Sequence, residues 1–197
     1  MPYVIPDFDK PLKTEELERL KKYCINAGTF VLTRYFYSEK ALRDFFTFKK
    51  RIPNRVDAVN DKGEKESVPL LEEVVDELRA QGVIDDKKYA HAKAESCLVF
   101  RGKSERATRA YLLEKGFTAN DTDEAIDKVV SDSAYDDDDA IKRAAGKIVR
   151  SPSFIKKDTT NRHKTFVRKL VSQGFELSDI LNLVNDGFLT EDLYNEE

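Results

Sequence analysis

The stretch that decides the fold runs from residue 84 to residue 117 and reads Ile-Asp-Asp-Lys-Lys-Tyr-Ala at 84–90, Arg-Gly-Lys-Ser-Glu-Arg at 101–106 and Glu-Lys-Gly-Phe at 114–117. Asp85 and Asp86 can accept the free N–H groups of a first helical turn, and apolar side chains follow them at helical spacing. Gly102 breaks this helix, and Ser104 offers a hydroxyl to cap a second one. The stretch therefore predicts a helical hairpin.

A Gly followed by a large apolar residue ends the second helix of this hairpin, at Gly116-Phe117. Glycine adopts positive φ at little steric cost, and the apolar residue after it folds back onto the last helical turn. The same pair recurs at Gly174-Phe175, and aligning the two pairs also places Leu112 on Leu170. The sequence therefore predicts an internal repeat whose second helices end in left-handed glycines.

Further apolar stripes extend this pattern to three units of three helices each. Ser38 aligns with Ser104 as a cap, Ser67 is the expected cap of the third helix of the first unit, and Thr160 or Asn161 should precede a helix of the third unit. The first unit lacks the Gly-Phe stop and has Lys50-Arg51-Ile52-Pro53, followed by a polar insertion that can carry a short hairpin. We expect an extended arm at 1–13, units at 14–83 (insertion 50–67), 84–133 and 134–189, and an acidic tail at 190–197.

Such units bury their faces against one another. The expected fold class is thus all-α, with tandem repeats of a three-helix unit forming an elongated, curved molecule. The chain has only 8 Gly and 6 Pro, and 36% of its residues are charged. This composition is typical of a mostly helical protein. No apolar run approaches the roughly 20 residues that span a bilayer, and the N-terminus lacks a signal peptide, so we expect a cytoplasmic protein with no membrane contact, and a monomer. Cys24 and Cys97 fall on apolar stripes, where reduced core thiols are expected.

Three patterns invite a chemical interpretation. Asp136–Asp139 could bind a divalent cation, but consecutive carboxylates at a helix start point in different directions, and capping is favoured. His91 and Glu95 share a helix face, yet no second His follows at metal-site spacing. His163 lies beside apolar positions and is expected to be a partly buried structural side chain. We therefore expect no enzyme, no metal and no cofactor, although a metal-dependent enzyme using the acidic run stays a weaker alternative.

The basic residues carry more information. The net charge is −3, but 140–170 holds ten Lys or Arg against one Asp, whereas 118–139 holds nine acidic residues against Lys128 alone. Basic residues also recur at similar places in the three units, and this recurrence favours a continuous positive stripe for phosphates or an acidic partner over ordinary solvated helix faces. The candidate partner or DNA-binding residues are Arg34, Lys40, Arg43, Arg101, Lys103, Arg106, Arg109, Lys156, Lys157, Arg162, Lys164, Arg168 and Lys169.

Taken together, the motifs resemble the RecX family of bacterial recombination regulators. The resemblance rests on Gly-Val-Ile-Asp-Asp-x-x-Tyr-Ala at 82–90, Lys103-Ser104, Lys-Gly-Phe at 115–117 and Ser-Gln-Gly-Phe at 172–175 with Ile180. It implies tandem three-helix units, no catalysis, and binding in the groove of the RecA–DNA filament, where RecA ATPase and strand exchange are restrained during DNA repair, homologous recombination and the SOS response.

Two hypotheses follow. The leading one is a regulator whose partner is the RecA recombinase filament on single-stranded DNA, with direct DNA contact as an additional interaction. The alternative is a stand-alone helical module that binds nucleic acid without RecA.

Overall fold

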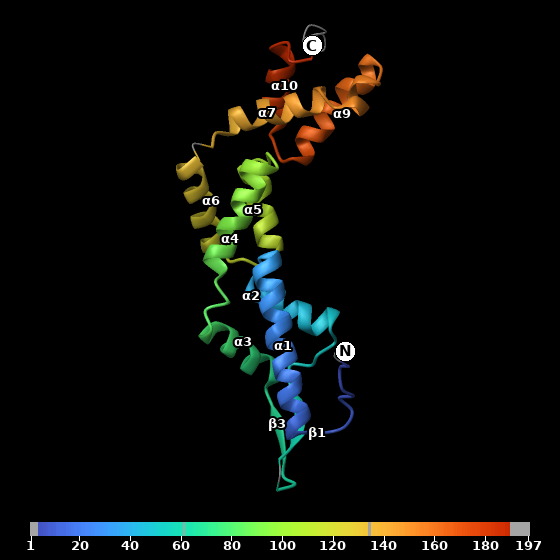
Figure 1. Cartoon of the computed structure of the whole chain (residues 1–197). Helices are drawn as coiled ribbons and strands as arrows, with labels where there is room; N and C mark the ends of the chain where they lie inside the picture. The colour runs from blue at the N-terminus through green and yellow to red at the C-terminus, as the bar shows by residue number, and fades with distance from the viewer. Residues whose placement is uncertain (1–3, 61, 134, 190–197) are drawn as a thin grey trace. The chain divides into compact units, whose positions relative to one another are not determined.

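The computed structural model describes residues 4–60, 62–133 and 135–189 (Figure 1). These residues fold mostly into α-helices, accompanied by one small three-stranded sheet. The predicted helical fold class is confirmed. The chain divides into two compact bodies: an N-terminal body of the described residues up to Ala90 with Lys115–Phe117, and a C-terminal body of His91–Glu114 with the described residues from Thr118 onward.

The N-terminal body is built around one long helix that packs against a shorter one. Leu20, Cys24 and Leu32 of the long helix are fully buried, as the apolar stripe predicts. The helices are α1 (Thr14–Tyr35), α2 (Glu39–Asp44), the π-helical turn η1 (Phe45–Lys49), α3 (Leu70–Ala80) and the start of α4 (Asp86–Glu95).

The insertion of the first unit forms a β-hairpin. Strands β2 (Val56–Val59) and β3 (Lys65–Val68) pair antiparallel, and β1 (Leu12–Lys13) joins β2 in parallel. The hairpin extends beyond the N-terminal end of α1 (Figure 1). The expected hairpin is confirmed, and the end of the predicted N-terminal arm is tied into a sheet.

One sequence-based expectation for the first unit is wrong. Ser67 does not cap a helix, because it lies in β3, where it pairs with Asp57, and α3 begins only after Pro69. The first unit lacks a Gly-Phe pair, as its sequence shows, but a left-handed residue ends its second helix as well. Arg51 adopts a left-handed φ of 53° and Ile52 is fully buried, as the Gly-Phe pairs predict for the other units. From Ser38 to Arg51 the chain is one residue longer than from Ser104 to Gly116. The π-helical turn η1 accommodates this residue, and in it the Lys50 N–H donates to the Phe45 carbonyl at 3.1 Å.

The C-terminal body pairs its helices successively: α5 packs on α6, α7 on α9, and α9 on α10. Its third unit contains one short helix more than the predicted three. The expected cap of α9 is also misplaced: Asp158 caps it, accepting the Asn161 N–H at 3.0 Å. The elements are the end of α4, the π-helical turn η2 (Ser96–Phe100), α5 (Glu105–Glu114), α6 (Ala119–Ser133), α7 (Asp137–Val149), α8 (Pro152–Ile155), α9 (Thr159–Ser172) and α10 (Leu177–Asn185).

Both cysteines are buried and reduced, as predicted. Burial raises the pKa of the Cys24 thiol to about 12 and raises that of Cys97 as well, so neither forms a thiolate readily. His163, in contrast, is exposed, because α9 turns Thr165 and Phe166 inward and leaves position 163 outside the core. Among the described helices, none has the length and apolar character needed to cross a membrane. The predicted acidic tail at 190–197 lies outside the described residues.

Candidate partner interface

A close junction forms where α2 meets the turn at Gly116. The Ser38 hydroxyl caps α2 by accepting the Ala41 N–H at 3.1 Å and donates to the Lys115 carbonyl at 2.7 Å. Gly116 has φ +87°, and a Cβ placed there would lie 2.9 Å from Ser38 Oγ. Both the positive φ and the close approach therefore require glycine.

The C-terminal body repeats this junction at Gly174. The Ser104 N–H donates to the Gln173 carbonyl at 3.1 Å, and the Ser104 hydroxyl accepts the Ala107 N–H at 3.2 Å. Gly174 has φ +95°, and a Cβ there would lie 2.3 Å from Ala107 Cβ. The predicted left-handed stops are confirmed. Each stop also receives the capped start of the second helix of another unit, a contact that was not predicted from the sequence.

Two of the thirteen candidate cations belong to these junctions. The Arg106 guanidinium donates to the Gly174 carbonyl at 3.0 and 3.2 Å and pairs with Glu176 at 2.9 Å. Lys40 holds the matching place beside Gly116, where a Cβ on the glycine would lie 3.0 Å from Lys40 Cβ. The charge of Arg106 thus has a structural role at its junction, whereas Lys40 contacts its junction through the aliphatic part of its side chain.

A second recurrent pair ties the second helix of a unit to its third. Arg43 on α2 donates to both carboxylate oxygens of Glu72 on α3, at 2.8 and 3.0 Å, and also pairs with Glu39 at 3.0 Å. Arg109 on α5 pairs with Asp123 on α6 in the same manner. The hydrogen bonds with Arg43 lower the pKa of Glu72, and those with Glu72 raise the pKa of Arg43.

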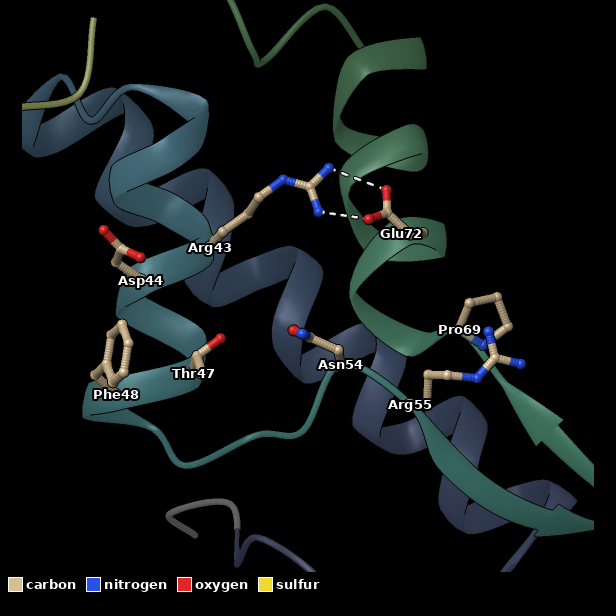
Figure 2. A pocket seen from close by; sticks show the side chains of 8 residues that line it. All are labelled: Arg43, Asp44, Thr47, Phe48, Asn54, Arg55, Pro69 and Glu72. Atoms are coloured by element: carbon tan, nitrogen blue, oxygen red, sulfur yellow. Dashed lines mark hydrogen bonds and ion pairs between the residues drawn. The ribbon is translucent and has the colours of Figure 1, made fainter.

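Figure 2 shows that Arg43 and Glu72 face each other at the edge of a pocket of about 480 Å³. Its other lining residues are Asp44, Thr47, Phe48, Asn54, Arg55 and Pro69. Arg55 is engaged as well, because its guanidinium donates to the Ser67 carbonyl at 2.7 Å. Two arginines and two carboxylates balance in charge, so the pocket is not suited to a phosphate group.

Two more candidates are engaged within the C-terminal body. The Lys103 ammonium lies 5.0 Å from the centre of the Tyr111 ring, within cation–π distance. The Arg162 guanidinium donates to the Ile155 carbonyl. These cations are held in place by their own body and are less available to a partner.

The cations best placed for a partner lie on α8 and α9. Lys156, Lys164 and Arg168 are exposed, and their side chains make no hydrogen bond or ion pair with other described residues. Lys164 and Arg168 are four residues apart on α9, so they share a helix face. We call these three residues the α8–α9 basic set. Lys157 and Lys169 are half-buried in the same segment, while Arg34 and Arg101 are exposed at the ends of α1 and η2.

The two motifs that could suggest a metal site, Asp136–Asp139 and the pair His91 and Glu95, lie on different helices. Asp136 caps α7, accepting the Asp139 N–H at 3.3 Å, which agrees with the capping interpretation. His91 and Glu95 both lie on α4. Across residues 4–60, 62–133 and 135–189, no three His, Cys, Asp or Glu side chains gather in a way that could hold a metal ion.

Comparisons with known proteins identify the fold. No family model matches the sequence, and no curated protein matches it. Solved structures do match, among them two of RecX proteins. The crystal structure of RecX from Lactobacillus salivarius is 15% identical, with a TM-score of 0.54, and the match covers 86% of this chain and 97% of that one. A crystal structure of regulatory protein RecX is 17% identical, with a TM-score of 0.52 and coverage of 90% and 79%. The chain therefore has the RecX fold, as its sequence motifs predict.

Proposed function

We propose that this protein regulates homologous recombination by binding RecA and the RecA–DNA filament and by lowering RecA ATPase and strand exchange. The observation that carries the proposal is the extent of the structural likeness, which spans 97% of one RecX chain and 86% of this one. A shared fold alone does not fix a function, so the proposal also relies on the residues.

The α8–α9 basic set supplies the physical argument. A protein filament on DNA carries phosphate charge, and cations that are exposed and unpaired can replace its counterions. Arg43, Arg106 and Arg109 are less suited to this role, because each already pairs with a carboxylate of its own body. We therefore place the filament contact on Lys156, Lys164 and Arg168.

The proposed action requires binding and no bond chemistry, in keeping with a regulator of the cytoplasmic recombination machinery. RecA hydrolyses ATP on the filament, and a protein bound there can change that rate without catalysis of its own.

The ATPase rate of RecA on preassembled filaments tests the proposal. The strand is first saturated with RecA, so that the protein cannot act by sequestering bare DNA. We expect wild-type protein to lower the rate and Lys164→Glu/Arg168→Glu to need a higher concentration for the same effect.

The matched control is Lys142→Glu/Lys147→Glu, which makes the same charge change at exposed positions of α7. It should inhibit like wild type. An ATPase rate that wild-type protein leaves unchanged would contradict the proposed function. If both double variants lose the same amount of inhibition, the α8–α9 basic set does not make the filament contact.

A further inference from the structure

Aromatic side chains in the N-terminal body form a continuous, partly exposed series. Phe30 and Tyr35 lie with ring centroids 5.9 Å apart, Tyr35 and Tyr37 6.1 Å apart, and Tyr37 and Phe45 6.2 Å apart. Phe30 is 57% exposed and Tyr35 is 50% exposed. We call Tyr23, Phe30, Tyr35, Tyr37 and Phe45 the aromatic surface; Tyr23 joins it through a lysine.

That lysine is Lys50, whose ammonium lies 5.5 Å from the centre of the Phe45 ring and 5.9 Å from that of Tyr23. Arg34 is one turn after Phe30 on α1 and is exposed, as is Lys49 on η1. Cations therefore border the rings along their length.

The two segments that build this surface contain no acidic residue. Residues 19–38 and 45–56 hold eight Lys or Arg and no Asp or Glu, although Glu39 and Asp44 lie between the two segments. Three of the eight are engaged elsewhere, since Arg19 and Lys21 pair with carboxylates and Arg55 donates to the Ser67 carbonyl. Exposed aromatic rings are not needed on a surface that contacts only water. A border of cations is not needed on a surface that binds an apolar segment of another protein. Rings combined with cations match unpaired nucleotides, whose bases stack on aromatic faces while their phosphates attract Lys and Arg.

We propose that the aromatic surface is a binding site for single-stranded nucleic acid that acts without RecA. It differs from the α8–α9 basic set in its residues, its body and its chemistry, because it recognises bases as well as phosphates. Duplex DNA binds it weakly, since paired bases are not free to stack on the rings. The inference stands independently of the proposed regulation of RecA.

The test compares oligonucleotides that share a phosphate backbone. Fluorescence anisotropy is measured with a labelled oligothymidylate, with an abasic strand of equal length and with a duplex, across a salt series. We expect the abasic strand and the duplex to bind at least about five-fold more weakly than oligothymidylate. Equal affinity for all three would overturn the proposal, as would the absence of binding to any of them.

Phe30→Ala and Tyr35→Ala test the residues, since both side chains are half exposed and their loss disturbs little of the core. Each should weaken oligothymidylate binding by about five-fold or more and leave abasic binding unchanged. Phe48→Ala is the matched control: this ring is 75% exposed in the same body, but it lies beside Asp44 at the pocket of Figure 2. Equal losses in all three variants would overturn the proposal.

A spectroscopic measurement is also available because the chain has no Trp. Phe30→Trp introduces a single reporter, whose fluorescence should be quenched by oligothymidylate and not by the abasic strand. If Phe30→Ala instead weakens binding to RecA-saturated filaments and leaves oligothymidylate binding intact, the surface is a protein-docking site and the proposal fails.

Discussion

Gly174→Ala should destabilise the C-terminal body far more than a change of one methyl group usually does. The new Cβ would lie 2.3 Å from Ala107 Cβ and 2.5 Å from Ser104 Oγ. Ala107 has no rotatable side chain and cannot move aside, so α5 itself must shift. That shift would break the hydrogen bond from Ser104 to the Gln173 carbonyl, on which the junction depends.

The magnitude follows from three contributions. A non-glycine residue at positive φ costs about 1–2 kcal/mol. Forced overpacking adds about 1–3 kcal/mol, and one weakened hydrogen bond about 1 kcal/mol. The free energy of unfolding should therefore fall by about 3–6 kcal/mol, a large part of the roughly 5–15 kcal/mol typical of a folded domain.

Gly102→Ala is the matched control. Gly102 also has a positive φ, +64°, but a Cβ there would meet nothing within 4 Å. It should therefore cost only the backbone term, about 1–2 kcal/mol. Urea unfolding followed by circular dichroism measures both variants. If Gly174→Ala and Gly102→Ala lose the same stability, the close junction between Gly174 and α5 does not exist.

Three further changes test other contacts. Arg106→Ala should lower the free energy of unfolding by roughly 1 kcal/mol, because the Arg106 guanidinium donates to the Gly174 carbonyl at the end of α9. The control Arg168→Ala should change the free energy of unfolding by no more than about 0.5 kcal/mol. Equal losses for both variants in urea unfolding would contradict this role of Arg106. Asp158→Ala should lower the melting temperature at pH 7 but progressively less in acid. Hydrogen bonds from Asn161 lower the pKa of Asp158, so the ionised carboxylate stabilises the folded state above its unfolded-state pKa. This stabilisation is lost as the pH falls through the folded-state pKa. A loss that does not change with pH, or one shared by Asp127→Ala in the middle of α6, would argue against the cap. Tyr135→Phe should cost about 1 kcal/mol, because it removes a buried hydroxyl that lies 2.7 Å from the Lys103 carbonyl, and a melting temperature equal to wild type would show that this bond is not formed.

Local signals in the sequence predicted much of the fold. Helical periodicity identified the core faces, and side-chain oxygens at Ser38 and Ser104 predicted caps that the structure confirms. The Gly-Phe pairs predicted left-handed stops at Gly116 and Gly174. Each of these features depends on residues within one helical turn of each other, so a single sequence is sufficient to read them.

The expectations that failed depend on contacts between distant residues. Arg51 was not recognised as a helix stop, because a π-helical turn shifts the register by one residue and leaves a bulky side chain at positive φ. Ser67 has the sequence of a cap but pairs in a sheet with Asp57. No propensity distinguishes these alternatives, since tertiary pairing decides between them.

The candidate site shows the same limit. Recurrence of Arg43 and Arg109 suggested a shared partner surface, yet each pairs with a carboxylate on the next helix of its own unit. The signal that could have identified this role was the presence of Glu72 and Asp123 early in those helices. The aromatic surface was not predicted either, because Tyr37 links the rings of α1 to Phe45 of η1 only once the chain has turned from α1 into α2.

Co-sedimentation with RecA filaments tests the central claim most directly. Single-stranded DNA is saturated with RecA in the presence of a slowly hydrolysed ATP analogue, pelleted with the protein at physiological salt, and compared with the same strand without RecA. We expect wild-type protein and Phe30→Ala to pellet with the filament at equal levels, more completely than with bare DNA, and a larger share of Lys164→Glu/Arg168→Glu to stay in the supernatant. Recovery in the pellet that is no greater with RecA than without it would rule out binding to the RecA filament.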